Sequence, residues 1–210
     1  MSYAVKEMFL TLQGEGINAG ARAVFVRFAG CNLWSGREKD RSTAICSFCD
    51  TDFVGTDGLG GGKFADAAAL VAAVAGFWGE ARNDRLVVLT GGEPMLQVDD
   101  ALVDALHTAG FRIAIETNGT LAAHPRIDWV CVSPKAGSAV VQRSGDELKL
   151  VWPQPGTDLD AIERWDFAHR LLQPLDSADH AANIAACVQL VMQRPQWRLT
   201  LQAHKLLGLR

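Results

Sequence analysis

The sequence has no long hydrophobic run, since no apolar stretch approaches the length of about 18 residues that a membrane-spanning helix needs. It has no excess of basic residues, because 24 acidic residues against 20 lysines and arginines give a net charge of −4. Its start, MSYAVKEMFLTLQGEG, lacks the basic residues and apolar core of a secretory signal. We therefore expect a cytoplasmic protein that binds neither membranes nor nucleic acids.

The composition is that of an ordinary globular protein, with 49% hydrophobic and 21% charged residues. We find no internal repeat and no low-complexity tract, and the glycine-rich GTDGLGGGK (55–63) is the one segment that resembles a flexible link. Because domains usually contain roughly 100–200 residues, the 210 residues indicate a single domain, 1–210.

Short apolar runs alternate with helical patterns along the chain. The strand candidates are 23–30, 86–90, 111–117, 128–133, 147–152, 167–173 and 197–203, and the helix candidates are 64–78, 96–110, 157–164 and 177–193. Strands separated by helices pair in parallel, with right-handed crossovers. A closed eight-unit barrel needs about 250 residues. Since this chain is shorter and several connections carry no helix, we predict an α/β fold with an incomplete, open (β/α) barrel.

Polar residues stand where four of these strands end. Thr90 precedes GGEP, Glu116 precedes TNG, Ser133 precedes PK and Gln173 precedes PLD. Ligands bind at the carboxyl ends of strands in parallel α/β sheets and barrels. Turn formation is an alternative for any single tip, because Gly, Pro, Asn and Asp are the usual turn residues. It explains all four together poorly, so we predict a binding site on this rim.

Arg27 is the one charged residue in the apolar strand AVFVRF (23–28). Such a strand is expected to be buried on both faces, and a buried guanidinium needs a partner that matches its planar fork, such as a carboxylate. An internal carboxylate, for example that of Glu15 or Glu116, would supply it. The other possibility is an acidic group of a ligand.

Three cysteines flank a charged insert in RFAGCNLWSGREKDRSTAICSFCDTDF (27–53). Cys46 and Cys49 are close enough in CSFC to reach one metal centre, whereas fourteen residues separate Cys31 from Cys46. If Cys31 reaches the same centre, the insert must form a solvated loop, as its charges suggest. Disulfides are rare in the cytosol, and Cys-x-x-Cys there more often indicates metal or redox chemistry.

A zinc site would require a fourth ligand, and the nearest histidine in the sequence is His107. The remaining cysteines, Cys131 and Cys187, fall within apolar patterns typical of small buried side chains. Three thiolates with an open position suit an iron–sulfur cluster, because an iron atom without a protein ligand can bind a small molecule. Zinc remains the alternative on spacing alone.

The motif CSFCD, followed by TGGEP at the tip of the next strand, resembles the radical S-adenosylmethionine superfamily. The superfamily usually has three residues between the first two cysteines, so the insert at about 32–45 is a departure. LQGEG, LTGGEPMLQ, ETNGT, VSPK, ELKLVW, LLQPL and WRLTLQAHKLLGLR together resemble 7-carboxy-7-deazaguanine synthases, from Leu12 to Arg210. Members of that family also carry inserts between these cysteines.

The resemblance implies a radical SAM lyase with an open barrel trimmed in helices. Its reaction converts 6-carboxy-5,6,7,8-tetrahydropterin to 7-carboxy-7-deazaguanine with loss of ammonia, in queuosine biosynthesis. A [4Fe-4S] cluster cleaves S-adenosylmethionine to a 5′-deoxyadenosyl radical that takes hydrogen from C6 of the pterin. The radical is regenerated, so S-adenosyl-L-methionine is used catalytically. Magnesium, Mg2+, is also required. Flavodoxin or ferredoxin as electron donor and a homodimer are the implied partners.

The resemblance also assigns residues. The cluster ligands are Cys31, Cys46 and Cys49. The S-adenosylmethionine site comprises Phe48, Cys49, Asp50, Gly91, Gly92, Glu93, Glu116, Ser133, Pro134, Lys135, Gln173, Pro174, Leu175 and Asp176. The pterin site comprises Leu12, Gln13, Gly14, Glu15, Arg27, Thr90 and the terminal Arg210. Thr51 is the magnesium ligand, since Mg2+ takes few protein oxygens and completes its shell with substrate and water.

The C-terminal tail, at about 204–210, folds back toward the site in the family, and the apolar spacing of KLLGL favours a docked tail over a frayed end. The sequence assigns no role to His204 or Lys205. Two rival functions remain, a glycyl-radical activase and a non-catalytic zinc-binding module. Turnover of a pterin excludes the first, and an iron–sulfur absorption spectrum excludes the second.

Overall fold

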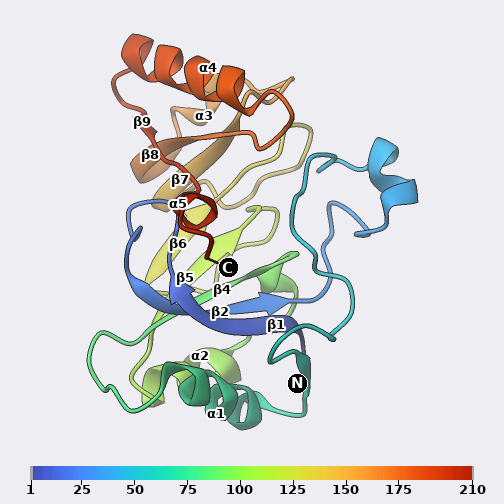
Figure 1. The fold of residues 1–210 in the computed structure, drawn as a ribbon, viewed down its shortest axis with the longest axis vertical. Coiled ribbons are helices and arrows are strands. Elements are labelled where there is room, and N and C mark those ends of the chain that lie inside the picture. The colour runs from blue at the N-terminus through green and yellow to red at the C-terminus, as the bar shows by residue number, and fades with distance from the viewer. Residues whose placement is uncertain (1, 210) are drawn as a thin grey trace.

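A single nine-stranded sheet forms the framework of the computed structural model, which describes residues 2–209 (Figure 1). The strand order is β3-β1-β2-β4-β5-β6-β7-β8-β9. The strands are β1 (Tyr3–Leu12), β2 (Arg22–Phe28), β3 (Gly62–Phe64), β4 (Leu86–Gly91), β5 (Arg112–Thr117), β6 (Trp129–Val132), β7 (Ser144–Trp152), β8 (Asp166–Pro174) and β9 (Arg198–Leu199). All pairs from β2 to β9 are parallel, whereas β1 is antiparallel to β2 and β3. The edge strands β3 and β9 do not pair with each other within the described chain, so the sheet is open.

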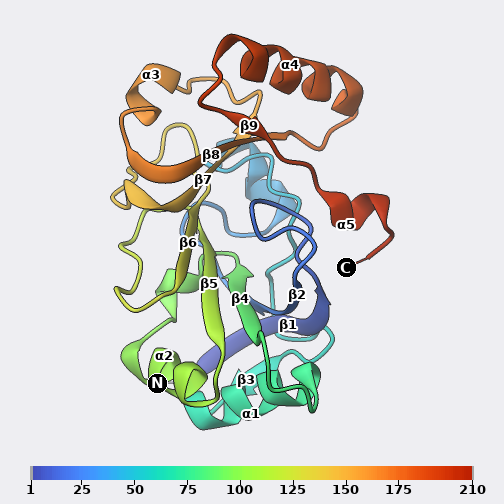
Figure 2. The same ribbon diagram turned by 90° about the vertical axis from the view of Figure 1, so that its left-hand side faces the viewer.

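Helices cover only parts of the outer face (Figures 1 and 2). The helices of the chain are α1 (Ala67–Trp78), α2 (Asp100–Thr108), α3 (Leu159–Ile162), α4 (His180–Gln193) and α5 (Ala203–Leu206), with 3-10 turns η1 (Glu38–Thr43) and η2 (Pro94–Leu96), and α5 lies at the cavity rather than on the outer face. Aspartate side chains cap the first three helices. The connections from β5 to β6 and from β6 to β7 carry no helix, as expected for a trimmed barrel. Within residues 2–209, no helix is both long and apolar enough to cross a membrane.

Side-chain alternation along the strands divides the core from the interior of the barrel. One set, including Val26, Leu89 and Ile115, packs beneath α1 and α2, and Leu148 and Leu172 pack with residues of α4. The neighbouring positions face inward, where Ala23, Leu86, Val88 and Ala114 form a small apolar base. Because the period is two, the inward positions nearer the carboxyl ends are Arg27, Thr90, Glu116, Lys149 and Gln173, all of which line one cavity.

Three parts of the chain differ from the sequence prediction. The expected strand 197–203 pairs only at Arg198–Leu199, and Ala203–Leu206 is a helix. The sequence reading missed β1 and β3. The glycine-rich segment is packed against β1 and is not a free link, because Gly58 N donates to the Lys6 carbonyl at 2.9 Å and Met8 N donates to Leu59 O at 2.7 Å. A Cβ at Gly61 would overlap the carbonyl oxygen of Lys6, so glycine permits this approach.

Candidate active site at the open rim

The carboxyl ends of the parallel strands surround a cavity of about 430 Å³, a volume within the usual range of small-molecule sites. The four polar tips predicted to form a site, Thr90, Glu116, Ser133 and Gln173, all line it. The β1–β2 loop, the cysteine loop and the C-terminal segment supply the rest of the wall. The cavity is thus built from segments across the whole chain.

All three cysteines of the predicted cluster loop line this cavity. Burial raises the pKa of the Cys31 thiol. A hydrogen bond between Cys46 and Cys49 raises the pKa of Cys46 and lowers that of Cys49 to about 6. Within residues 2–209, no three His, Cys, Asp or Glu side chains gather tightly enough to hold a single metal ion. Cysteines that each bind a different iron atom of a cluster need not meet at one point.

The charged insert lies outside the body of the protein, where η1 projects beyond the sheet (Figure 1). No residue of η1 is buried, as the sequence indicated. Arg41 nevertheless folds back. Its guanidinium lies 4.1 Å from the ring centre of Trp34, and its Nη1 donates to the carbonyls of Ser47 and Cys49. The insert therefore braces the backbone around Cys46 and Cys49.

The GGEP turn sits directly beneath the first cysteine. Glu93 N donates to the Gly30 carbonyl at 2.9 Å, and a Cβ at Gly92 would overlap that same carbonyl oxygen. Glu93 itself does not line the cavity. Its carboxylate is fully buried and accepts hydrogen bonds from the Thr117 hydroxyl and the Asn118 amide. Burial raises the pKa of Glu93. The assignment of Glu93 to the methionine amino group stays a prediction.

Arg27 lines the cavity and pairs with an internal carboxylate as expected, but that carboxylate belongs to neither of the two examples, Glu15 and Glu116. Its Nε donates to Glu7 Oε1 at 2.9 Å, from the paired strand β1. The antiparallel register places Glu7 opposite Arg27. This pairing could not be anticipated from the sequence, because β1 was not predicted as a strand.

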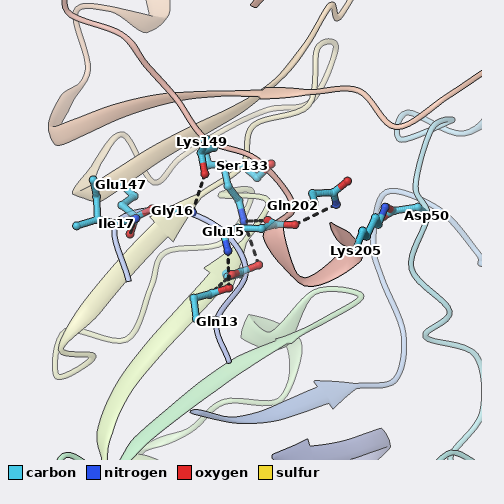
Figure 3. Close-up of polar contacts among 12 residues, drawn as sticks. Gln13, Glu15, Gly16, Ile17, Asp50, Ser133, Glu147, Lys149, Gln202 and Lys205 are labelled. Atoms are coloured by element: carbon cyan, nitrogen blue, oxygen red, sulfur yellow. Dashed lines mark hydrogen bonds and ion pairs between the residues drawn. The ribbon is translucent and has the colours of Figure 1, made fainter. Parts of the chain in front are cut away.

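An ion cluster around the buried Lys149 forms the floor of the cavity (Figure 3). Lys149 Nζ donates to Glu15 Oε2 at 2.5 Å and to Glu116 Oε2 at 3.2 Å. Burial alone would lower the pKa of Lys149, but the two carboxylates outweigh it and hold that pKa well above its ordinary value. Burial likewise opposes ionisation of Glu15, yet Lys149 keeps the pKa of Glu15 below its usual value.

The C-terminal segment docks against the cavity through polar contacts. Ala203 N donates to the Gly14 carbonyl at 2.9 Å, Gln202 bonds to Glu15, and Lys205 reaches Asp50 and Asp176. The leucines of KLLGL do not hold the tail, because Leu206 is 77% exposed and its neighbour is also exposed. Arg210, assigned to the pterin from the sequence, lies outside the described residues.

The chemistry of the lining suits the cofactors expected from the sequence. Within residues 2–209 only three cysteines line the cavity, which leaves a fourth iron of a [4Fe-4S] cluster free for a ligand. Gln173 is 6% exposed, and its Oε1 is buried without a hydrogen-bond partner among the described residues. A donor from a bound molecule or from water would satisfy this acceptor.

Most residues predicted from the sequence line the cavity; among the described ones, Glu93 and Pro134 do not. Pro134 supports the rim, since its carbonyl accepts a hydrogen bond from Gln154. The sequence reading missed several lining residues, among them Glu7, Trp34, Asn118, Lys149, Gln202, His204 and Lys205. Lys149 could have been found by the argument used for Arg27, because it is a lone charge within the apolar run LKLVW (148–152).

The open parallel sheet, with three cysteines in one rim loop beside a GGEP turn, defines a radical S-adenosylmethionine enzyme. No protein-family model matches the sequence. Curated relatives do. The 7-carboxy-7-deazaguanine synthases of Bordetella pertussis and Burkholderia multivorans are 59% and 58% identical to this chain, with full coverage of both partners.

The chain therefore belongs to the 7-carboxy-7-deazaguanine synthase family. The crystal structure of QueE from Escherichia coli is similar, with a TM-score of 0.72 and 29% identity over 97% of this chain and 95% of that one. The predicted family and the predicted open α/β barrel are thus confirmed.

Proposed function

We infer that this chain converts 6-carboxy-5,6,7,8-tetrahydropterin to 7-carboxy-7-deazaguanine with loss of ammonia, in queuosine biosynthesis. The observation that carries this inference is the full-length identity of 59% to a 7-carboxy-7-deazaguanine synthase, together with the three cysteines that line the cavity. The enzyme is a radical SAM lyase that uses a [4Fe-4S] cluster and S-adenosylmethionine.

When bound, the cluster supplies the electron that splits S-adenosylmethionine homolytically. We propose Cys31, Cys46 and Cys49 as the cluster ligands, and the GGEP turn, whose backbone lies beside Cys31, as the site of the methionine amino group. We assign the adenosyl group to the rim on both sides of this turn, where Phe48, Asp50, Ser133, Lys135 and Gln173 to Asp176 line the cavity. Gln173 offers the unpaired acceptor described above.

We place the pterin between the β1–β2 loop and the floor. Leu12, Gln13 and Gly14 line this part of the cavity with Arg27 and Thr90. Arg27 uses its Nε on Glu7, and a guanidinium carries further N–H donors, which suit the carboxylate of the substrate. Arg210 is proposed to complete this side on the family resemblance.

We propose that the Thr51 hydroxyl binds magnesium. The residue lines the cavity directly after the cluster loop. One hydroxyl is a weak site alone, because Mg2+ needs about six oxygens and takes the others from water and substrate. Magnesium and the pterin are therefore expected to bind cooperatively. Titration of magnesium into the holoenzyme with and without pterin tests this, and equal affinities would contradict it.

Three further expectations depend on the family and on architecture. We propose that the chain acts as a single domain, which the continuous sheet supports. We also propose a homodimer and a flavodoxin or ferredoxin as the electron donor. Sedimentation of the purified protein tests whether it is a homodimer. Replacement of the chemical reductant in the assay by flavodoxin or by ferredoxin tests which of them donates the electron.

Anaerobic incubation of the reconstituted protein with the carboxy-tetrahydropterin, S-adenosylmethionine, magnesium and a reductant tests the proposed reaction. We expect 7-carboxy-7-deazaguanine and ammonia in equal amounts. A protein that carries the cluster but leaves the pterin unchanged would contradict the proposal and would favour a glycyl-radical activase. A colourless protein with stoichiometric zinc would favour a binding module.

A further inference from the structure

Lys149 is a buried cation at the floor of the cavity to which the sequence assigned no role. It occupies an inward position of β7, and its side chain is 5% exposed. Its ammonium group contacts Glu15 from the β1–β2 loop and Glu116 from the tip of β5. One side chain therefore joins three separate parts of the active site (Figure 3).

The two carboxylates are held at both oxygens. Gln13 Nε2 donates to Glu116 Oε1 at 2.9 Å, and Gln202 Nε2 donates to Glu15 Oε1 at 3.0 Å. Gln13 is fixed in turn, because its Oε1 accepts from Glu15 N at 3.0 Å. Each carboxylate is thus restricted to one orientation. All five side chains line the cavity.

The charges in this cluster do not balance, because two carboxylates share one ammonium group. The other titratable groups that interact with the cluster are Cys131, Lys135, Glu147 and His204. A purely structural ion pair would be neutral, and apolar residues of similar volume often replace such pairs without loss of stability. The side chains of Glu15 and Glu116 are 13% and 22% exposed, and an excess carboxylate that is this far removed from water is costly unless it is well hydrogen-bonded. A ligand with N–H donors in the cavity would supply that bond.

We propose that Lys149 is a positioning residue, which holds the carboxylates of Glu15 and Glu116 oriented to accept hydrogen bonds from the N–H groups of the reduced pterin ring. This inference rests on the proposed function. Glu116, which the family resemblance assigned to S-adenosylmethionine, then belongs to the pterin side through its bonds to Gln13 and Lys149. Lys149 itself does not need to touch the substrate.

Lys149→Met tests the proposal, because it keeps the length of the side chain and removes the charge. In the reconstituted holoenzyme, we expect the KM for the pterin to rise about ten-fold or more, the typical effect of losing a charged hydrogen-bond partner. The KM for S-adenosylmethionine and the iron content are expected to stay unchanged. Lys63→Met, at an exposed position of β3, is the matched control.

The pH profile separates positioning from packing. Without the ammonium group, burial is left to raise the pKa of Glu15. The acid limb of kcat/KM for the pterin is then expected to move to higher pH in Lys149→Met. A side chain that only fills space would leave this limb where it is. If Lys149→Met does not fold or bind iron, Lys149→Gln keeps one donor and undergoes the same measurements.

The proposal would be overturned if the variant had the same KM for the pterin and the same acid limb of kcat/KM as the wild type. Equal increases in the KM for the pterin and the KM for S-adenosylmethionine would also overturn it. These outcomes are distinct from a failure of the proposed function. If the wild-type holoenzyme makes no deazaguanine product, the proposed function is wrong. If the wild type is active and the variant is indistinguishable from it, only the role of Lys149 is wrong.

Discussion

Lys205 Nζ lies 2.9 Å from Asp50 Oδ2, so the C-terminal helix α5 is tied to the cysteine loop. The same ammonium group lies 2.5 Å from Asp176, beyond the tip of β8. Burial works against the charge on Lys205, but the hydrogen bonds that it donates to the two aspartates prevail and raise its pKa. The tail thereby joins two segments that we assign to opposite sides of the adenosyl group.

Lys205→Met is expected to raise the KM for S-adenosylmethionine about two- to five-fold. The effect is modest because all three side chains are more than a third exposed, and exposed ion pairs are worth at most about 1 kcal/mol. Steady-state kinetics at low and high salt provide the measurement. Salt screens the pair, so the difference from wild type should shrink at high ionic strength. Lys39→Met in the exposed insert is the control; a difference that does not depend on salt contradicts the interpretation.

Cys46→Ala is expected to abolish binding of an intact [4Fe-4S] cluster, because two thiolates remain where three are required. Anaerobic reconstitution followed by iron and sulfide analysis and visible absorption measures the loss. Cys187→Ala is the matched control, since Cys187 is fully buried in the apolar cluster of β7, β8 and α4. It should lose some stability and keep its cluster. Equal iron in both variants would exclude Cys46 as a ligand.

Gly92→Ala tests the contact between the GGEP turn and the cysteine loop. The new methyl group would overlap the Gly30 carbonyl oxygen and push the turn away from Cys31. We expect binding of S-adenosylmethionine to weaken at least about ten-fold, as measured by equilibrium dialysis of the reconstituted protein. Gly76→Ala in α1 is the control, because its new methyl group would meet no atom within 4 Å and alanine favours helices by about 1 kcal/mol. If both variants bind S-adenosylmethionine equally well, the close approach of Gly92 to the Gly30 carbonyl does not matter for binding.

Glu147→Gln tests a buried carboxyl group outside the main cavity. Burial raises the pKa of Glu147 in the folded protein above its unfolded value of about 4.3. The protonated carboxyl group therefore favours the folded state at low pH. This contribution to stability is lost as the pH rises through the folded pKa. Glutamine keeps an oxygen that can accept from Trp129 Nε1 and Ile17 N. We expect the variant to melt about 2–4 °C above wild type near pH 7.5 and at a similar temperature near pH 4.5. Calorimetry that finds the opposite trend would show that Glu147 is ionised and well paired.

Alternating apolar runs made most of the parallel strands predictable, because β2, β4, β5 and β8 bury one face under helices and direct the other into the barrel. The same period explains why Thr90, Glu116 and Gln173 meet at one rim. β1 escaped prediction because part of its pairing, that with β3, depends on contacts distant in sequence, including the close approach of the glycine-rich segment.

Local patterns identified the cysteines and the strand tips but could not identify partners. Arg27 pairs with Glu7 through the register of two antiparallel strands, which no local pattern encodes. The fold likewise decides that Lys205 meets Asp50 across 155 positions of sequence. Lys149 was open to prediction as a lone charge in an apolar strand, but its two carboxylate partners were not.

The fate of a deuterium label at C6 of the pterin tests the central claim most directly. The reconstituted, oxygen-free protein is incubated with the labelled carboxy-tetrahydropterin, S-adenosylmethionine, magnesium and a reductant, and both the product and the recovered S-adenosylmethionine are analysed by mass spectrometry. A vacant iron corner beside the pterin predicts 7-carboxy-7-deazaguanine together with deuterium in the recovered S-adenosylmethionine. Unlabelled S-adenosylmethionine, or its consumption in proportion to product, would contradict the account.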